Sequence, residues 1–119
     1  MKIRIKGNAL RYRLTKSDVA SLLKNRQLAD SVDFGMQKLV YEVRIVDDHL
    51  LSSTYNNHTI TLYMPEKMIR EMAETDKVGF ENERHIPHLL VEKDFTCLDN
   101  VTEDQSDNYP NPLAAKEYE

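Results

Sequence analysis

The chain has 119 residues, of which 40% are hydrophobic and 30% charged, and this predicts one globular domain with a well-charged surface. No stretch approaches the roughly 20 consecutive apolar residues of a transmembrane helix. The first six residues alternate charged with aliphatic side chains, unlike the apolar core of a signal peptide. A single cysteine, Cys97, excludes an internal disulfide framework. We therefore expect a cytoplasmic protein without a membrane partner.

The net charge of −4 is unevenly distributed along the chain. Residues 1–50 carry ten Lys or Arg and six Asp or Glu, a net charge of +4, whereas residues 51–119 carry six and fourteen, a net charge of −8. Such a split is compatible with a basic binding face, with an acidic tail that covers this face, or with solubility alone.

Two short alternating segments open the chain. In residues 2–6 and 10–14, basic side chains alternate with aliphatic or aromatic ones, which is the period of a half-buried strand. Gly7 and Asn8 between them form a turn signal. The two segments therefore predict a β-hairpin with one basic and one apolar face.

A helix and two strands are expected in the rest of the first half. Thr15 is a suitable N-cap, with Asp18 three residues later, and apolar residues at helical spacing predict a helix over 16–25. Strands are expected over 27–34 and over 39–46, the second of which is rich in β-branched and aromatic residues.

The same order of elements returns after residue 50. A helix is expected to begin near Pro65, a residue suited to the first helical turn. The hydrophobic patterns of the two halves align at an offset of 50 without a gap, although only two aligned pairs are identical, Leu39/Leu89 and Glu42/Glu92. Strands are expected in this half over 50–55, 59–64, 77–83 and 89–98.

The patterns together predict an α+β domain over residues 1–98, made of two pseudo-repeated ββαββ units at 1–49 and 51–98. These units would form a mainly antiparallel eight-stranded barrel or a curved sheet with two short helices, and the pattern does not separate the two arrangements. Duplication would place a shared pocket or groove between the halves. The alternative is a coincidence between two ordinary hairpin units.

The last residues differ in character from the domain. Residues 99–119 are acidic, and Pro110 and Pro112 interrupt any regular element. They predict an irregular C-terminal tail, from which Tyr109 could still dock onto the domain.

The predicted hairpin provides the main candidate site. Five cations would share one of its faces, where they could bind an anionic ligand or partner. Two other interpretations remain open: a solvated strand face that charge protects from edge pairing, and a face covered by the acidic tail. The five residues are Lys2, Arg4, Lys6, Arg11 and Arg13.

Two weaker groups of residues could carry metal or thiol chemistry. His85, His88 and Cys97 include ligand types of zinc, but their spacing fits surface or loop positions better, so we assign no metal. The second group lacks the spacing of an EF-hand loop, and its acidic residues would raise the pKa of a nucleophilic thiol. This group consists of Asp94, Cys97, Glu103, Asp104 and Asp107.

No motif assigns a catalytic residue or a cofactor. The three glycines form no phosphate-binding loop, and no serine lies in a nucleophile elbow. The strand–Pro–helix–strand order of residues 59–81 resembles the βαβ element of swapped-hairpin DNA-binding domains, but the flanking charges are mostly acidic.

Two stretches resemble a known family. Residues 1–17, which read MKIRIKGNALRYRLTKS, are similar to the opening of an uncharacterised family of short bacterial proteins, a domain of unknown function. Residues 90–112, with Leu-Val-Glu-Lys-Asp-Phe-Thr-Cys-Leu and the later Tyr-Pro-Asn-Pro, resemble its C-terminal end. The resemblance implies a bacterial single-domain protein and supplies no activity, cofactor or catalytic residue.

Three functions follow as hypotheses. The first is a non-enzymatic binding or interaction module that uses the basic hairpin face. The second is a small enzyme or metal-binding protein centred on Cys97 with nearby histidines or carboxylates. The third is a nucleic-acid-binding barrel, which the acidic net charge disfavours. An exposed edge strand would also allow a homodimer.

Overall fold

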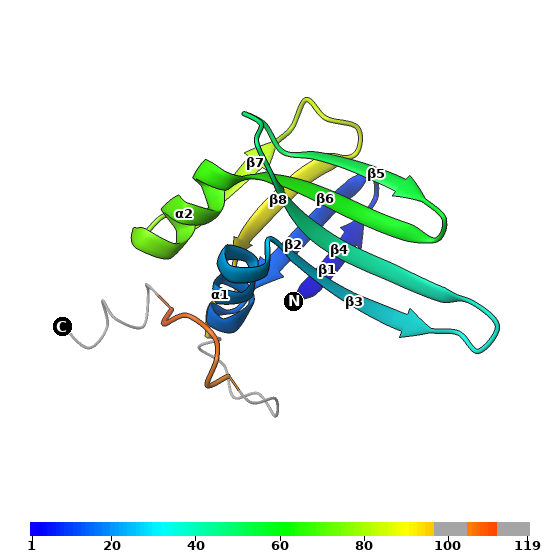
Figure 1. The fold of residues 1–119 in the computed structure, drawn as a ribbon, viewed down its shortest axis with the longest axis horizontal. Coiled ribbons are helices and arrows are strands. Elements are labelled where there is room, and N and C mark those ends of the chain that lie inside the picture. The colour runs from blue at the N-terminus through cyan, green and yellow to red at the C-terminus, as the bar shows by residue number, and fades with distance from the viewer. Residues whose placement is uncertain (97–104, 112–119) are drawn as a thin grey trace.

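The structure, a computed structural model, describes residues 1–96 and 105–111. Within them, two helices and eight strands follow one another as two ββαββ units (Figure 1). The first unit contains β1 (Lys2–Lys6), β2 (Ala9–Leu14), α1 (Lys16–Asn25), β3 (Gln27–Asp33) and β4 (Lys38–Val46). The second contains β5 (Ser52–Asn56), β6 (Thr59–Pro65), α2 (Glu66–Glu74), β7 (Gly79–Asn82) and β8 (His88–Lys93).

The strands form two four-stranded sheets, in the orders β1-β2-β8-β7 and β3-β4-β6-β5. Each unit contributes one antiparallel hairpin to each sheet, and the two hairpins of a sheet meet in a central parallel pair, β2 with β8 and β4 with β6. The prediction of a mainly antiparallel α+β fold from two similar units is confirmed. The strands do not close into a barrel.

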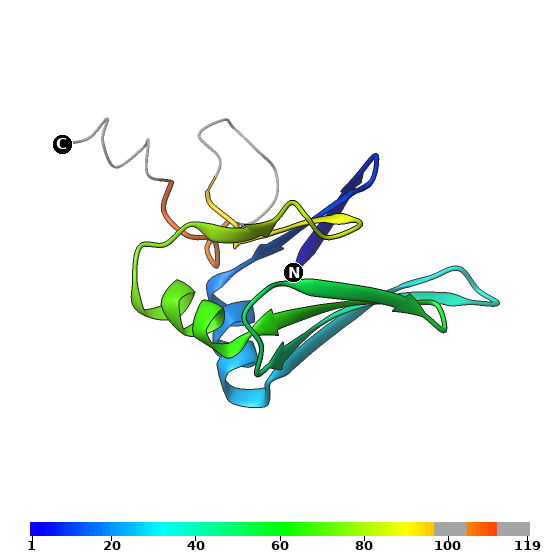
Figure 2. The ribbon, with the colours of Figure 1, turned by 90° about the horizontal axis from the view of Figure 1, so that it is seen from above.

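The hydrophobic core lies between the two sheets. Seen from above, the sheets form two layers that diverge toward their hairpin turns, while both helices lie at the opposite end (Figure 2). The alternation in β2 directs Leu10, Tyr12 and Leu14 inward, and β6 does the same with its apolar residues, because successive side chains of a strand point to opposite faces. The fully buried members from the other elements include Leu22, Val43, Ile69, Met72, Leu89 and Val91.

Local signals explain the ends of α1. The side chain of Thr15 accepts a hydrogen bond from the amide of Asp18, and the Asp18 carboxylate accepts one from the amide of Thr15, which forms a reciprocal capping box. At the other end Arg26 adopts a left-handed conformation with φ 62°. The helix predicted over 16–25 is therefore confirmed. In contrast, Pro65 ends β6 and precedes α2, which has no side-chain cap.

The two units match more closely in space than the ungapped sequence alignment suggests. The offset of 50 holds for the first hairpins, since Ile3 pairs with Tyr12 as Ser53 pairs with Leu62. In the last two strands it is wrong by two residues. Tyr12 and Leu62 hold equivalent positions, and their parallel partners, Val91 and Val43, are 48 residues apart. The antiparallel partners of these valines, Phe80 in β7 and Leu28 in β3, are 52 residues apart.

Two differences in chain length cause these shifts: the connection from α2 to β7 is longer than its counterpart, and the β7–β8 hairpin, in which Phe80 pairs with Val91, is shorter than the β3–β4 hairpin, in which Leu28 pairs with Val43. One residue joins α1 to β3, whereas residues 75–78 join α2 to β7. The strand expected over 77–83 begins only at Gly79 for the same reason, and the strand expected over 89–98 ends at Lys93. No helix in the described parts of the chain is long and apolar enough to cross a membrane.

Candidate functional site

The predicted basic residues do lie on one face of the first sheet. The inward-facing residues of β1 and β2 pack on the core, so the alternate residues between them point outward. The register sets Lys2 opposite Arg13 and Arg4 opposite Arg11. We call the outward set of Lys2, Arg4, Lys6, Arg11 and Arg13 the basic face.

Within residues 1–96 and 105–111, carboxylates neutralise one end of the basic face. In β8, Glu92 lies with its Oε1 3.6 Å from Nε of Arg11 and 3.3 Å from Nε of Arg13, so two guanidinium groups share one carboxylate. The Nζ of Lys2 lies 3.4 Å from Oδ2 of Asp94. Arg4 and Lys6 form no ion pair with any residue in 1–96 or 105–111.

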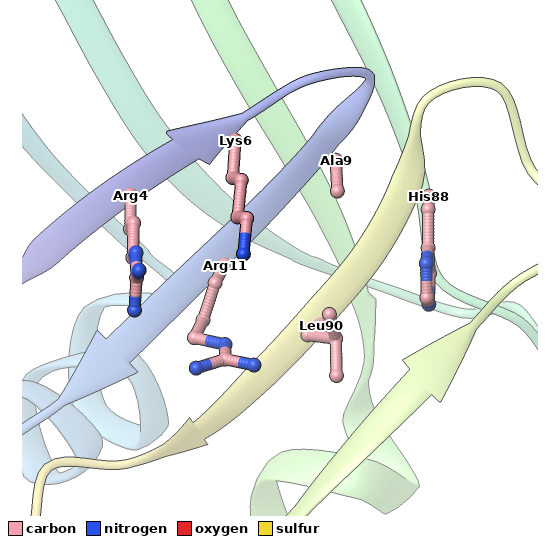
Figure 3. Close-up of a pocket in the computed structure, with 6 residues that line it drawn as sticks. All are labelled: Arg4, Lys6, Ala9, Arg11, His88 and Leu90. Atoms are coloured by element: carbon pink, nitrogen blue, oxygen red, sulfur yellow. The ribbon is translucent and has the colours of Figure 1, made fainter.

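The unneutralised end borders an open hollow of about 430 Å³. Figure 3 shows that its lining comes from three adjacent strands, with Arg4 and Lys6 on β1, Arg11 on β2, and two residues of β8. Its apolar lining consists of Ala9 and Leu90. Three long cations around a small apolar floor can bind an anion through charge-assisted hydrogen bonds, since a guanidinium offers two parallel donors to a carboxylate or phosphate.

The two candidate histidines have other partners. His85 lies in the loop before β8, where its Nε2 accepts a hydrogen bond from the amide of Ser53 at 3.2 Å and its Nδ1 lies 3.0 Å from the carbonyl oxygen of Pro87. Nδ1 is therefore the protonated nitrogen in this arrangement. On the opposite side of the loop, Nε2 of His88 lies 2.6 Å from Oε2 of Glu81, at the border of the hollow.

Of the three candidate metal ligands, the described residues include only His85 and His88. Among the residues that the structure describes, no three His, Cys, Asp or Glu side chains form a group that could hold a metal ion. Cys97, Glu103 and Asp104 lie outside the described residues, so the thiol and two of the carboxylates have no structural account.

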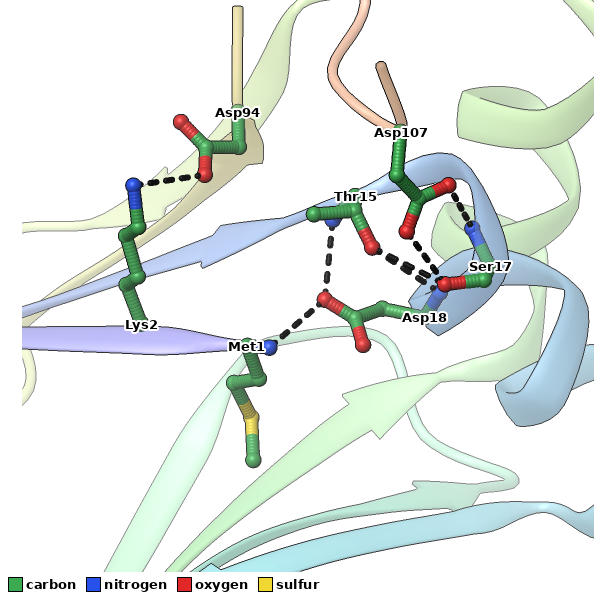
Figure 4. Close-up of polar contacts among 7 residues, drawn as sticks. All are labelled: Met1, Lys2, Thr15, Ser17, Asp18, Asp94 and Asp107. Carbon is green, nitrogen blue, oxygen red and sulfur yellow. Dashed lines mark hydrogen bonds and ion pairs between the residues drawn. The ribbon is translucent and has the colours of Figure 1, made fainter. Parts of the chain in front are cut away.

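Asp94 and Asp107, the remaining acidic candidates, anchor the chain after β8 (Figure 4). The buried carboxylate of Asp94 faces Lys2. Asp107 accepts hydrogen bonds from the amide of Ser17 at 3.1 Å and from its hydroxyl at 2.5 Å, at the start of α1. The hydrogen bonds from Ser17 and Thr15 lower the pKa of Asp107 below its ordinary value.

Residues 105–111 pack against the helix end of the molecule. Tyr109 pairs with Phe95 as an isolated bridge, its ring lies edge-on to that of Phe95 at 6.3 Å, and Nζ of Lys93 sits 4.9 Å from its centre. Burial, followed by the charges of Asp107 and Asp18, raises the pKa of Tyr109. None of the residues around the Arg4–Lys6 hollow comes from this segment, so the described part of the tail leaves the hollow open.

Sequence reasoning missed the contribution of β8. Leu90, His88 and Glu92 complete the basic face only because β8 pairs in parallel with β2, nearly 80 residues away along the chain. The alternation of β8 was visible, but its partner strand was not, since a strand pattern carries no information about which strand lies beside it.

The comparisons with known proteins identify a family without an activity. No curated protein and no solved structure is significantly similar to the chain. A family model described as a family of unknown function, DUF7009, matches residues 1–113. The match includes the whole sheet β1-β2-β8-β7, which carries the basic face, and residues 105–111. The chain therefore belongs to the family of unknown function DUF7009.

Proposed function

We propose that this protein is a non-enzymatic binding module, whose basic face holds the anionic group of a ligand or partner. The observation that supports the proposal most directly is the juxtaposition of Arg4 and Arg11 beside Lys6, with no carboxylate paired to Arg4 or Lys6 in the described chain. Like charges directly opposite each other destabilise a sheet. An anion in the hollow would remove this repulsion, so the same residues that weaken the free protein would stabilise the complex.

The proposed interaction is electrostatic and lies at the surface. Exposed charges attract one another over about 10 Å at 0.1 M salt, and less at higher ionic strength. We therefore expect the affinity to fall steeply as the salt concentration rises. The cytoplasmic location expected from the sequence belongs to this proposal, because phosphate-bearing and carboxylate-bearing molecules are abundant there.

Calorimetric titration with inorganic pyrophosphate tests the proposal, because its two phosphoryl groups can contact two guanidinium groups at once. The wild type should bind at low salt, and Arg4→Glu should weaken binding by about tenfold or more. The matched control is Lys67→Glu on the exposed surface of α2, which changes the net charge equally and should leave binding unchanged. Equal loss in both variants, or no binding by the wild type, would contradict the proposal.

A further inference from the structure

β1 is an edge strand, and no described residue pairs with its outer edge. It pairs only with β2 and ends the first sheet. Because a two-residue turn joins the two strands, Lys6 and Ala9 form a hydrogen-bonded pair, and the next pair, Ile5 with Leu10, does not exchange backbone hydrogen bonds. The amide and carbonyl groups of Ile5 and Ile3 therefore point away from β2, and no described residue bonds to them.

The second unit shows the same geometry with the edge occupied. Ser53 holds in β5 the position that Ile3 holds in β1, and its amide donates outward to Nε2 of His85. A loop thus covers part of the β5 edge, while the equivalent groups of β1 lack such a cover within the described residues. The structure contains a backbone edge that is ready to pair with another extended strand.

We propose that β1 accepts an extended acidic segment of a partner protein as a fifth strand of the first sheet. This inference rests on the proposed function and names its partner class. The segment alternates Asp or Glu with apolar residues. Its backbone bonds to Ile3 and Ile5, while its acidic side chains lie on the outer side beside Arg4 and Lys6, at cross-strand distance.

The inner side of β1 is apolar, which is why the proposed segment carries apolar residues at every second position. Ile5 points toward the space between the sheets, yet 59% of its surface is exposed, and Ile3 is only partly buried. Apolar residues of an added strand would cover Ile5 and extend the core by one row. Each residue of the segment would thus meet a matching side chain, with acids on one face and apolar groups on the other.

The charges on this edge disfavour a second copy of the chain as occupant. Antiparallel pairing of two β1 strands would place Arg4 beside Arg4 and Lys2 beside Lys6, and such like-charge pairs oppose association. An acidic strand would instead place carboxylates beside Arg4 and Lys6. The charges on the edge therefore disfavour self-association and favour an acidic partner.

Two synthetic peptides of about ten residues test the pairing without altering the protein. In the first, Glu alternates with Val; the second has the same composition with its Glu residues in one block. Strand addition predicts that the alternating peptide binds about tenfold more tightly, because only its alternation matches both faces of β1. N-methylation of alternate amides in the alternating peptide should lower its affinity to that of the block peptide, because the methyl groups remove the ladder donors.

A proline variant tests the edge from the side of the protein. Ile5→Pro removes an amide that β2 does not use, which an edge strand tolerates, and should weaken the alternating peptide by about tenfold. Tyr55→Pro is the matched control, since Tyr55 holds the same position in β5, and should bind as the wild type does. Ile5→Val keeps both the amide and an apolar side chain and should also retain binding.

The possible outcomes separate this inference from the proposed function. If the two peptides bind equally well while Arg4→Glu weakens both, the basic face binds anions but β1 accepts no strand. If neither peptide nor pyrophosphate binds, the proposed function itself fails. Hydrogen exchange gives a direct reading: the amides of Ile3 and Ile5 should exchange quickly in the free full-length protein and slowly with the alternating peptide. Slow exchange in the free protein would overturn the inference, because the edge would already be occupied.

Discussion

Arg4 and Arg11 lie directly opposite each other across β1 and β2. A neutral side chain at either position would make the hairpin more stable, because like charges directly opposite each other destabilise a sheet. Glu92 lies near Arg11 but makes no ion pair with Arg4. The free protein therefore carries a local repulsion that a purely structural hairpin would not need.

Replacing Arg4 should stabilise the free protein. Arg4→Thr removes the repulsion and introduces a good strand former, so the free energy of unfolding should rise by roughly 0.5 kcal/mol or less at low salt, since Arg4 is exposed and Arg11 is only half-buried. The gain should vanish at about 1 M salt, because exposed charges then interact over only about 3 Å. Urea unfolding at the two salt concentrations measures both. A loss of stability at low salt would show that Arg4 has a structural partner.

Tyr12 is buried in the centre of the core with its hydroxyl oxygen unpaired among the described residues. Burial also raises the pKa of this hydroxyl well above its ordinary value. Tyr12→Phe should leave the free energy of unfolding unchanged or raise it by about 1 kcal/mol, because a buried polar group without a partner is costly. Tyr12→Ala should lower it by about 3–5 kcal/mol through the cavity that it leaves. Chemical denaturation distinguishes the two, and a clear loss in Tyr12→Phe would reveal a bonded hydroxyl.

The two glycines at the ends of the first sheet should respond differently to alanine. A Cβ at Gly79 would lie against the carbonyl oxygen of Val91 and 2.8 Å from Cα of Glu92, so β7 and β8 would have to separate. Gly79→Ala should therefore lower the free energy of unfolding by roughly 2 kcal/mol or more. At Gly7, where φ is +56° and no atom lies within 4 Å, only backbone strain of about 1 kcal/mol is expected. Equal thermal shifts in the two variants would contradict this ranking.

Acid should release the segment that Asp107 holds on α1. The hydrogen bonds from Ser17 and Thr15 keep the pKa of Asp107 in the folded protein below its ordinary value of 3.8. Their stabilising contribution is therefore fully present above pH 3.8 and is lost as the pH falls through the lower, folded pKa. The NMR shift of the Ser17 amide should follow this titration. Asp107→Asn, which cannot ionise, should abolish the pH dependence of that amide.

Local patterns in the sequence predicted the elements of this fold well, because alternation and capping depend on near neighbours. Tyr12 and Leu14 alternate with arginines and are buried, and Thr15 with Asp18 forms the expected capping box. The basic face followed from the same alternation. The duplication was also readable, because the polar and apolar order repeats even where the residues differ.

The pairing of strands could not be predicted in this way. Nothing near Leu10 indicates that Leu89 lies beside it in a parallel pair, and the two-residue shift between the units depends on loop lengths that a hydrophobic pattern does not record. The sequence predicted a groove between the halves but not its position, since Leu90 and His88 reach the hollow only through this long-range pairing.

The exchange of hairpins between the units also affects how the chain must be synthesised. Because β2 needs β8 beside it and β4 needs β6, neither half can complete a sheet from its own residues. The β1–β2 hairpin can pair with β8 only after His88–Lys93 has left the ribosome. A nascent chain that stalls near Val46 would present four strands with unmatched apolar faces, so chaperones should capture this protein at that length.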